Sequence, residues 1–336
     1  MNPPIEIKIR ELQLRDPFGI ARGTRRTVRN LFIRIGDGLG EGAPIYYRGQ
    51  TVEHMAQLAH EWVVQQPDLE RPIDDIIDEL VMHYPNETGL WQAIDLALHD
   101  ALGKKQGASL DQMWSIPQRS DLISSFTIGM DQLDVVMQKV ERAAPYPILK
   151  IKVGGRQDLE TLQAIAQKTG KQLYIDANEG WSAEQTLEYL PIMQQCNVRL
   201  IEQPLPDADR DGYRRIMQAN HTGIPIIVDE SVHGPEDITK WIGLADGINI
   251  KLAKCGGLHR ARKMINIARD NNLCIMLGCM IESSLGTTAA AHLAPLADYL
   301  DLDGAALISN DPFQGMRLDH GEIVMPDGVG IGVSTL

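Results

Sequence analysis

Charged residues end six of the short apolar segments in the second half of the chain, where they could bind a metal ion and move protons. An unpaired buried charge costs several kcal/mol, so six such ends together indicate a functional site. Side chains two positions apart on a strand share a face and can enter one cavity. The polar residues at these ends are Lys150 and Lys152, Asp176 and Asn178, Glu202, Asp229 and Glu230, Asn249 and Lys251, and Asp301 and Asp303.

Three carboxylates follow three successive segments: Asp176, Glu202 and Asp229. If they converged without a cation, they would repel one another and some would have to be protonated. A hard divalent cation removes this repulsion, and Mg²⁺ favours a few carboxylates together with water and substrate oxygens. These residues therefore predict a magnesium site.

Lysines flank the three carboxylates in chain order, with Lys150 and Lys152 before them and Lys251 after them. In a closed barrel the second and sixth strands lie opposite each other, so a substrate held on the metal would have an amine on each face. This arrangement suits removal of a proton from a carbon next to a carboxylate, stabilisation of the enolate by the metal, and return of a proton to the opposite face. The base must be neutral, and we expect Lys150 and the metal to lower the pKa of Lys152.

The segments that carry these residues recur at a spacing of about 25 residues, and each is followed by a helix-like stretch. They begin at residues 122, 148, 173, 199, 224, 247, 274 and 300. Strands that alternate with helices indicate βαβ units and a parallel sheet, and eight units predict a (β/α)8-type barrel. A doubly wound open sheet is the alternative, although the turn after the first segment, GMDQLD, lacks a nucleotide-binding fingerprint.

The first part of the chain has a different pattern, with strands followed by helices, which suggests a small α+β domain. Expected strands at 5–14 and 31–44 flank a basic loop from Gly19 to Arg29. The expected helices span 52–65, 72–84 and 89–106.

The composition excludes some classes of partner. The chain has 32 Lys+Arg and 45 Asp+Glu, a net charge of −13, which argues against a nucleic acid or an anionic membrane as partner. No apolar run approaches the ~18 residues of a membrane helix, and the N-terminus has no signal-peptide pattern. The four cysteines form no CxxC pair and are expected to be reduced core residues of a cytoplasmic protein.

Several motifs resemble those of the muconate-lactonizing subgroup of the enolase superfamily: KIKVG, IDANEGW, IEQP, VDES, INIKLAKCGG, LGCMIESSLG and the late DLDGA. The resemblance implies a (β/α)7β modified TIM barrel at 116–311 and an N-terminal α+β capping domain at 1–115, completed by 312–336. It implies Mg²⁺ on the three carboxylates, Lys152 and Lys251 as acid/base catalysts, and Lys150 as a tuning residue. Asn178 and Glu230 would support the metal ligands.

More narrowly, the chain resembles dipeptide epimerases of the L-Ala-D/L-Glu type. The distinguishing motif is Asp301-Leu302-Asp303, because in that group such a pair binds the α-ammonium of the substrate. The resemblance thus implies inversion of the α-carbon of the C-terminal residue of a dipeptide. Another reaction of the superfamily, such as o-succinylbenzoate synthesis or cycloisomerisation, is the alternative, and a metal-binding scaffold without turnover is a third.

The side chain of the dipeptide is less well specified. In the family the loop between the first strands closes over the site, and here this loop carries Arg22, Arg25, Arg26 and Arg29. One of these arginines, with Arg22 and Arg25 as the named candidates, could clamp a glutamate side chain bidentately. A solvated basic loop is the alternative. Glu282 could instead favour a cationic side chain, or support Lys251. The expected partner is a small dipeptide, and a homo-oligomer is possible.

Overall fold

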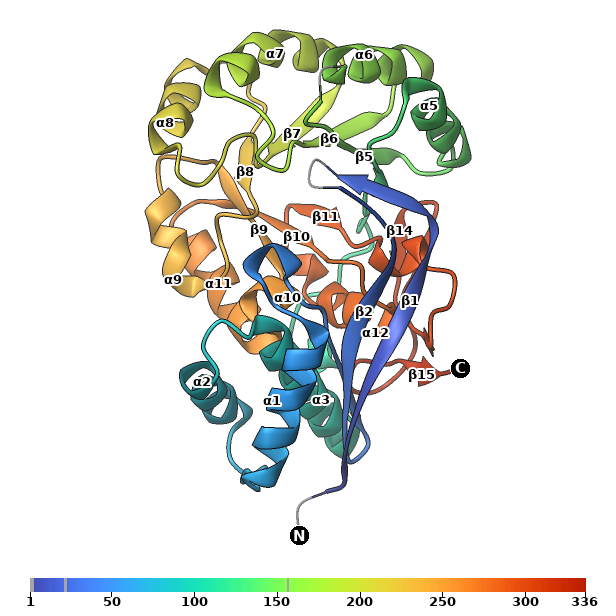
Figure 1. Ribbon diagram of the computed structural model, residues 1–336, viewed down its shortest axis with the longest axis vertical. Coiled ribbons are helices and arrows are strands. Elements are labelled where there is room, and N and C mark those ends of the chain that lie inside the picture. The colour runs from blue at the N-terminus through green and yellow to red at the C-terminus, as the bar shows by residue number, and fades with distance from the viewer. Residues whose placement is uncertain (1–2, 21–22, 156) are drawn as a thin grey trace.

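Two bodies of secondary structure lie one above the other in the computed structural model, which describes residues 3–20, 23–155 and 157–336 (Figure 1). The lower body in Figure 1 is a three-stranded antiparallel sheet packed on helices. Its elements are β1 (Ile5–Ile20), β2 (Gly23–Ile35), β3 (Gly38–Gly42), η1 (Tyr46–Arg48), α1 (Val52–Val64), α2 (Ile73–His83), α3 (Thr88–Gln106) and α4 (Leu110–Met113).

Helix α3 can lie directly on β3 because glycines alternate along this strand. A Cβ at Gly40 or Gly42 would come within 1.9 Å of a carbonyl oxygen of α3, so only glycine permits this approach. Because alternate residues of a strand face opposite sides, Leu39 and Glu41 point away from α3 toward the second body. Leu39 is part of the large apolar core of that body.

The basic stretch from Gly19 to Arg29 is mostly strand, so its prediction as a loop was wrong. β1 continues to Ile20 and β2 begins at Gly23, with the two residues paired in register. The arginines that suggested a solvated loop are compatible with a two-stranded ribbon, because alternate side chains of a ribbon face water. Arg22 lies outside the described residues.

The second body is an eight-stranded parallel sheet in consecutive order from β4 to β11. Its strands are β4 (Phe126–Ile128), β5 (Ile148–Lys152), β6 (Gln172–Asp176), β7 (Val198–Glu202), β8 (Ile226–Val228), β9 (Gly247–Lys251), β10 (Cys274–Gly278) and β11 (Tyr299–Asp301). The backbone N–H of Ser125 donates to Leu300 O at 3.0 Å, which connects the first strand to the last. The consecutive order and this connection confirm the barrel and exclude the open doubly wound sheet.

Helices follow seven of these strands and surround the barrel, whereas only the short η4 (Gly304–Leu307) follows β11 in the described chain. This arrangement confirms the (β/α)7β class. The helices are α5 (Leu133–Arg142), α6 (Asp158–Thr169), α7 (Ala183–Gln195), α8 (Arg210–Ala219), α9 (Pro235–Ile238) with η2 (Thr239–Trp241), α10 (Leu252–Cys255), α11 (Leu258–Asp270), and α12 (Ser284–Ala291) with η3 (Ala294–Leu296).

The C-terminal segment returns to the first body. Ile331 N donates to Asp100 of α3 at 2.8 Å, and Leu110 N donates to Gly330 O at 3.1 Å. The segment contains β12 (Phe313–Gln314), β13 (Arg317–Asp319), β14 (Glu322–Val324) and β15 (Ser334–Thr335). The domain boundaries given above stay a prediction. In the described part of the chain, no helix combines the length and apolarity needed to cross a membrane.

Candidate active site

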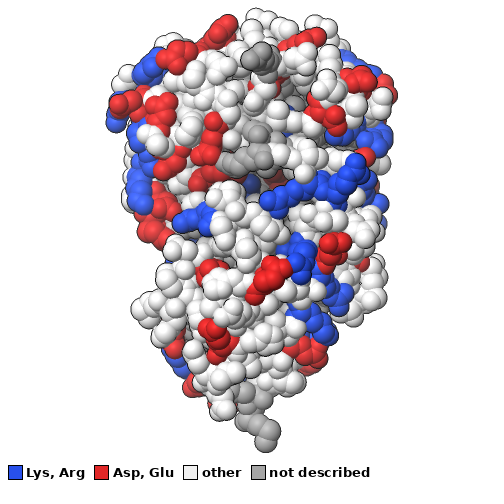
Figure 2. All heavy atoms as spheres, in the orientation of Figure 1, with Lys and Arg blue, Asp and Glu red and all other residues white. Residues whose placement is uncertain are grey.

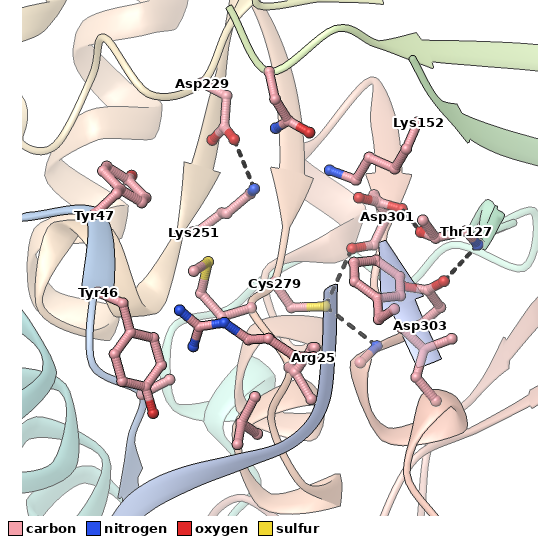
Figure 3. Close-up of a pocket in the computed structure, with 18 of the residues that line it drawn as sticks. Arg25, Tyr46, Tyr47, Thr127, Lys152, Asp229, Lys251, Cys279, Asp301 and Asp303 are labelled. Carbon is pink, nitrogen blue, oxygen red and sulfur yellow. Dashed lines mark hydrogen bonds and ion pairs between the residues drawn. The ribbon is translucent and has the colours of Figure 1, made fainter. Parts of the chain in front are cut away.

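A cavity of about 390 Å³ lies at the carboxyl ends of the barrel strands, where the end of β1 and the start of β2 also line it. Residues from both bodies line it, including Arg25 and Tyr46 from the first and Lys152, Lys251 and Asp301 from the second (Figure 3). The hairpin of β1 and β2 therefore forms a cover over the barrel mouth, which is the face where barrels of this class carry their active sites.

The three predicted metal ligands converge at this face. Asp176 and Glu202 end β6 and β7 and are paired in register, and Asp229 follows β8 directly. The three residues are 0%, 0% and 3% exposed, and one oxygen from each lies within 4.8 Å of the others. Among the described residues, this is the one group of its kind that could hold a metal ion.

The donor set fits Mg²⁺. All three ligands are hard carboxylate oxygens, which Mg²⁺ prefers. Glu202 Oε2 and Asp229 Oδ1 are buried and accept no hydrogen bond from any described residue, although an ammonium group lies near each. Each carboxylate oxygen carries two lone pairs, so an oxygen beside one ammonium group can still bind a cation.

Two lysines pair with opposite ends of this carboxylate row. Lys152 Nζ lies 2.5 Å from Asp176 Oδ2, and Lys251 Nζ lies 2.7 Å from Asp229 Oδ2. Their strands, β5 and β9, are the second and sixth of eight, so the lysines reach the cavity from different walls (Figure 3). This position places an amine on each side of any ligand bound between them.

Lys150 lies against three carboxylates at the end of the barrel. Its Nζ is 2.6 Å from Glu202, 2.7 Å from Asp301 and 3.1 Å from Asp176. Burial acts to lower the pKa of Lys150, but the charge of Asp301 and of the other carboxylates outweighs it and raises this pKa well above its usual value. Lys150 is therefore an ammonium that neutralises the site, and its expected effect on the pKa of Lys152 stays a prediction.

Burial and the neighbouring charges shift the pKa values of the acidic and basic groups in the site. Burial acts to raise the pKa of Asp176, but the charges of Lys152 and Lys150 outweigh it and lower this pKa to about 2. Burial, and then the charge of Asp176, raise the pKa of Glu202 to about 7. The pKa of Lys251 is raised, because the charge of Asp229 outweighs the opposing effect of burial.

Lys254, the second lysine of KLAK, is predicted from the sequence to be structural or to interact near the site, and it contacts Asp229. It is 1% exposed, and its Nζ lies 2.5 Å from Asp229 Oδ1 and donates to the carbonyl oxygens of Asp229, Val232 and Asn249. It thereby fixes the loop after β8 to the end of β9. The KLAK spacing was the available signal, because one turn of α10 separates Lys254 from Lys251.

A second group of acidic residues, Asp301 and Asp303, also lines the cavity. Asp301 accepts hydrogen bonds from Ser125 Oγ at 2.6 Å and Lys150 Nζ at 2.7 Å, and Asp303 accepts one from Thr127 N at 2.6 Å. Burial, and then the charge of Asp301, raise the pKa of Asp303 to about 7. A cation bound here would favour the ionised form of Asp303.

The remaining predicted residues are divided between the cavity and its surroundings. Asn178 and Glu230 line the cavity and are joined by a hydrogen bond of 3.0 Å. The guanidinium of Arg25 lies 4.0 Å from the Tyr46 ring centroid at the cavity edge. Glu282 is not among the described lining residues, because it is directed toward α3, where it accepts a hydrogen bond from Gln92.

Two family models match the chain. The model described as "Mandelate racemase / muconate lactonizing enzyme, N-terminal domain" matches residues 4–114, and the model described as "Enolase C-terminal domain-like" matches residues 134–335. Together they cover most of both bodies.

Relatives of known activity are similar over nearly the whole chain. An L-Ala-D/L-Glu epimerase of Bacteroides thetaiotaomicron is 34% identical over 96% of this chain and 85% of its own. The structure of a substrate-liganded L-Ala-D/L-Glu epimerase from Bacillus subtilis is similar with a TM-score of 0.92 at 28% identity, covering 99% and 98% of the two chains. A dipeptide epimerase from Enterococcus faecalis, complexed with Mg and L-Leu-L-Tyr, has a TM-score of 0.91 at 27% identity, covering 99% of both chains.

Proposed function

Because this chain belongs to the enolase superfamily, in its mandelate racemase and muconate lactonizing enzyme branch, we propose that it is a Mg²⁺-dependent dipeptide epimerase. Such an isomerase inverts the α-carbon of the C-terminal residue of a dipeptide. The observation that carries this assignment is the pairing of Lys152 and Lys251 with opposite ends of one carboxylate row, within a cavity that also holds Asp301 and Asp303.

In this proposal Lys152 and Lys251 exchange the α-proton on opposite faces. The unprotonated amine of one lysine removes the proton, and the ammonium of the other delivers a proton to the far side. Lys150 remains charged beneath the carboxylates, and Lys254 holds the Asp229 loop in place. Phe18 of the hairpin and Tyr46 and Tyr47 of η1 line the cavity and would exclude water from the reacting carbon.

Asp176, Glu202 and Asp229 would hold the Mg²⁺ ion. When bound, the ion supplies positive charge beside the substrate carboxylate, where negative charge develops as the α-proton leaves. Asn178 is placed to keep the site rigid, since its backbone N–H donates to Asp176 Oδ1 at 3.0 Å and its side chain donates to Glu230.

A screen of pooled L,L-dipeptides in D₂O tests the proposed function directly. We expect mass spectrometry to detect a gain of one deuterium at the C-terminal α-carbon of some dipeptides, together with formation of the other epimer. Absence of exchange from every dipeptide in a broad library, with Mg²⁺ present, would contradict the function and favour a scaffold without turnover.

The acidic pair separates a dipeptide epimerase from the alternative reactions. We expect Asp301→Asn and Asp303→Asn to raise KM for a dipeptide about 30-fold or more, because loss of one partner of a buried charge pair costs about 2 kcal/mol or more. In the wild type KM should also rise as the pH falls below about 7, since protonated Asp303 no longer attracts an ammonium.

Steady-state kinetics of both variants, with exposed Asp327→Asn as control, check this expectation. An o-succinylbenzoate synthase or a cycloisomerase has no substrate ammonium to bind. Activity that survives Asp301→Asn would therefore support one of those reactions instead.

Arg25 is proposed to select the substrate side chain. Apart from the three lysines, it is the one cation among the described lining residues, and the wall around it is largely apolar. Figure 2 shows basic side chains gathered across the middle of this face. We expect an acidic or an apolar C-terminal side chain to be accepted, and a cationic one to be rejected.

Arg25→Leu should lower kcat/KM for L-Ala-L-Glu about tenfold to a hundredfold, because a charge-assisted hydrogen bond is worth about 1.5–3 kcal/mol. The same substitution should change kcat/KM for L-Ala-L-Leu by no more than about twofold. The neighbouring Arg26 is exposed and does not line the cavity, so Arg26→Leu is a matched control. If Arg25→Leu lowered kcat/KM equally for both dipeptides, Arg25 would not determine the choice of side chain.

A cytoplasmic location and a homo-oligomeric state remain part of the proposal. The described cysteines Cys196, Cys255, Cys274 and Cys279 are all free, which supports a reducing compartment.

A further inference from the structure

Two buried carboxylates lie where the capping sheet meets the barrel, outside the site described above. Glu41 belongs to β3, and Glu282 belongs to the 279–283 segment that joins β10 to α12. Their side chains are 0% and 2% exposed. The charged groups that act on Glu282 are Glu41 from β3 and Lys251 from β9, while α3 and its own segment contribute neutral donors. Two uncompensated charges in one buried network cost several kcal/mol, so the pair requires an explanation.

Burial raises the pKa of Glu41, and a set of hydrogen bonds to its carboxylate opposes this effect. Its carboxylate accepts hydrogen bonds from Asn30 Nδ2 at 2.8 Å, from Ser283 N at 2.9 Å and Oγ at 2.5 Å, and from Gly286 N at 3.0 Å. Two of these donors are backbone N–H groups at the start of α12, where the helix favours a negative charge. Glu41 thus fixes the start of a barrel helix to the capping sheet.

Glu282 has fewer donors and a less favourable position. Its carboxyl accepts hydrogen bonds from Gln92 Nε2 at 2.5 Å and from Met280 N at 3.0 Å, and Gln92 is held in turn by Ala43 N at 3.1 Å. Burial, and then the charge of Glu41, raise the pKa of Glu282 to about 8. Burial raises the pKa of Glu41 as well, but the Glu41 carboxylate accepts more hydrogen bonds than that of Glu282. These donors favour a shared state in which Glu41 carries the charge and Glu282 keeps its proton at neutral pH.

The network ends at the wall of the active-site cavity. Asn30 Nδ2, which bonds Glu41, also donates to Ile281 O at 3.0 Å. Asn30, Ala43, Met280 and Ile281 all line the cavity. The two acids thus join β2, β3 and α3 of the capping body to one stretch of the substrate-facing wall.

We propose that Glu41 and Glu282 are positioning residues, which hold Met280 and Ile281 in the cavity wall as long as the pair carries a single negative charge. This inference rests on the proposed function for its effect on catalysis, because neither acid reaches the reacting atoms. The pair acts on substrate binding through the wall and the cover, so its loss changes KM more than kcat.

The direction of the pH effect follows from the raised pKa. Glu282 keeps its proton below pH 8 and loses it as the pH rises through 8, which places a second buried charge beside Glu41. One unit above this value about a tenth of the molecules remain protonated, so binding that requires the protonated pair weakens about tenfold by pH 9.

Two variants and one control test the proposal. Glu282→Gln keeps a neutral hydrogen-bonding group, so the ratio of wild-type KM to variant KM should rise about tenfold between pH 7 and pH 9. The ammonium of the dipeptide titrates identically with both proteins and cancels in this ratio. Glu41→Gln should raise KM about tenfold already at pH 7, with kcat reduced less than threefold. Exposed Glu188→Gln should follow the wild type at every pH.

Amide hydrogen exchange of residues 279–286 gives a second readout that does not depend on activity. After correction for intrinsic exchange, wild-type protection should fall about tenfold from pH 7 to pH 9, and Glu282→Gln should keep its protection. The positioning role would be overturned if wild type and Glu282→Gln lost amide protection in parallel between pH 7 and pH 9. It would also be overturned if an active enzyme kept the same ratio of wild-type KM to variant KM over this range. If the wild type exchanged no dipeptide, the proposed function would fail, and the amide protection alone would decide the proposal for the pair.

Discussion

Replacing either Lys152 or Lys251 by alanine should lower the rate of epimerisation about 10³-fold or more. Positioned general acid–base groups contribute about 10²–10⁴-fold each, and inversion requires both, since one face loses a proton and the other gains one. The two effects should not add, because a double variant has no further step to lose. Chiral chromatography of dipeptide epimers over time measures this rate.

The control for these variants is Lys105→Ala, because Lys105 is exposed at the end of α3. Thermal unfolding of each variant separates a chemical loss from a folding defect, since removing a lysine takes one of two ion-pair partners from Asp176 or Asp229. Lys150 remains beside Asp176, and Lys254 remains beside Asp229. Epimerisation within about tenfold of wild type in either folded variant would remove that lysine from the mechanism.

Removal of Mg²⁺ should abolish exchange, and the metal alone should stabilise the fold. Oxygens of three carboxylates lie close together in the barrel. Burial, and then the charge of Asp176, raise the pKa of Glu202 to about 7. A cation between the carboxylates would relieve their repulsion. At a hundredfold excess over Kd, bound metal adds about 2.7 kcal/mol to the free energy of unfolding. Calorimetry with and without MgCl₂ measures this stabilisation without any substrate.

Asp229→Asn should remove most of this stabilisation together with activity, because it removes the charge of one ligand. Asp270→Asn, at an exposed position at the end of α11, is the matched control. A wild-type protein whose unfolding temperature did not respond to Mg²⁺, or full activity in EDTA, would contradict the magnesium site.

The barrel and the charged strand ends could be predicted from sequence because both follow from local rules. Buried parallel strands are short apolar runs, and their carboxyl ends share one face, so Lys152, Asp176 and Glu202 had to lie close together. The metal and catalytic roles of these residues stay predictions until they are tested.

Other features depend on contacts between distant segments, which the sequence pattern does not reveal. The strands at 5–14 and 31–44 could be predicted, but the stretch from Gly19 to Arg29 between them was interpreted as a loop, because its arginines hide the strand alternation at the end of β1 and the start of β2. Glu282 follows β10 as the active-site residues follow their strands, yet Gln92 from α3 holds it away from the cavity. Glu41 gave no signal at all, since its role exists only where β3 meets α12.

The central claim is that two amines face the α-carbon from opposite sides, and exchange of each pure epimer in D₂O by the two single-lysine variants tests it most directly. Proton NMR should show that Lys152→Ala exchanges the α-hydrogen of one epimer only, that Lys251→Ala exchanges that of the other, and that neither variant interconverts them. Exchange of the same epimer by both variants would place the two lysines on one face and contradict the account.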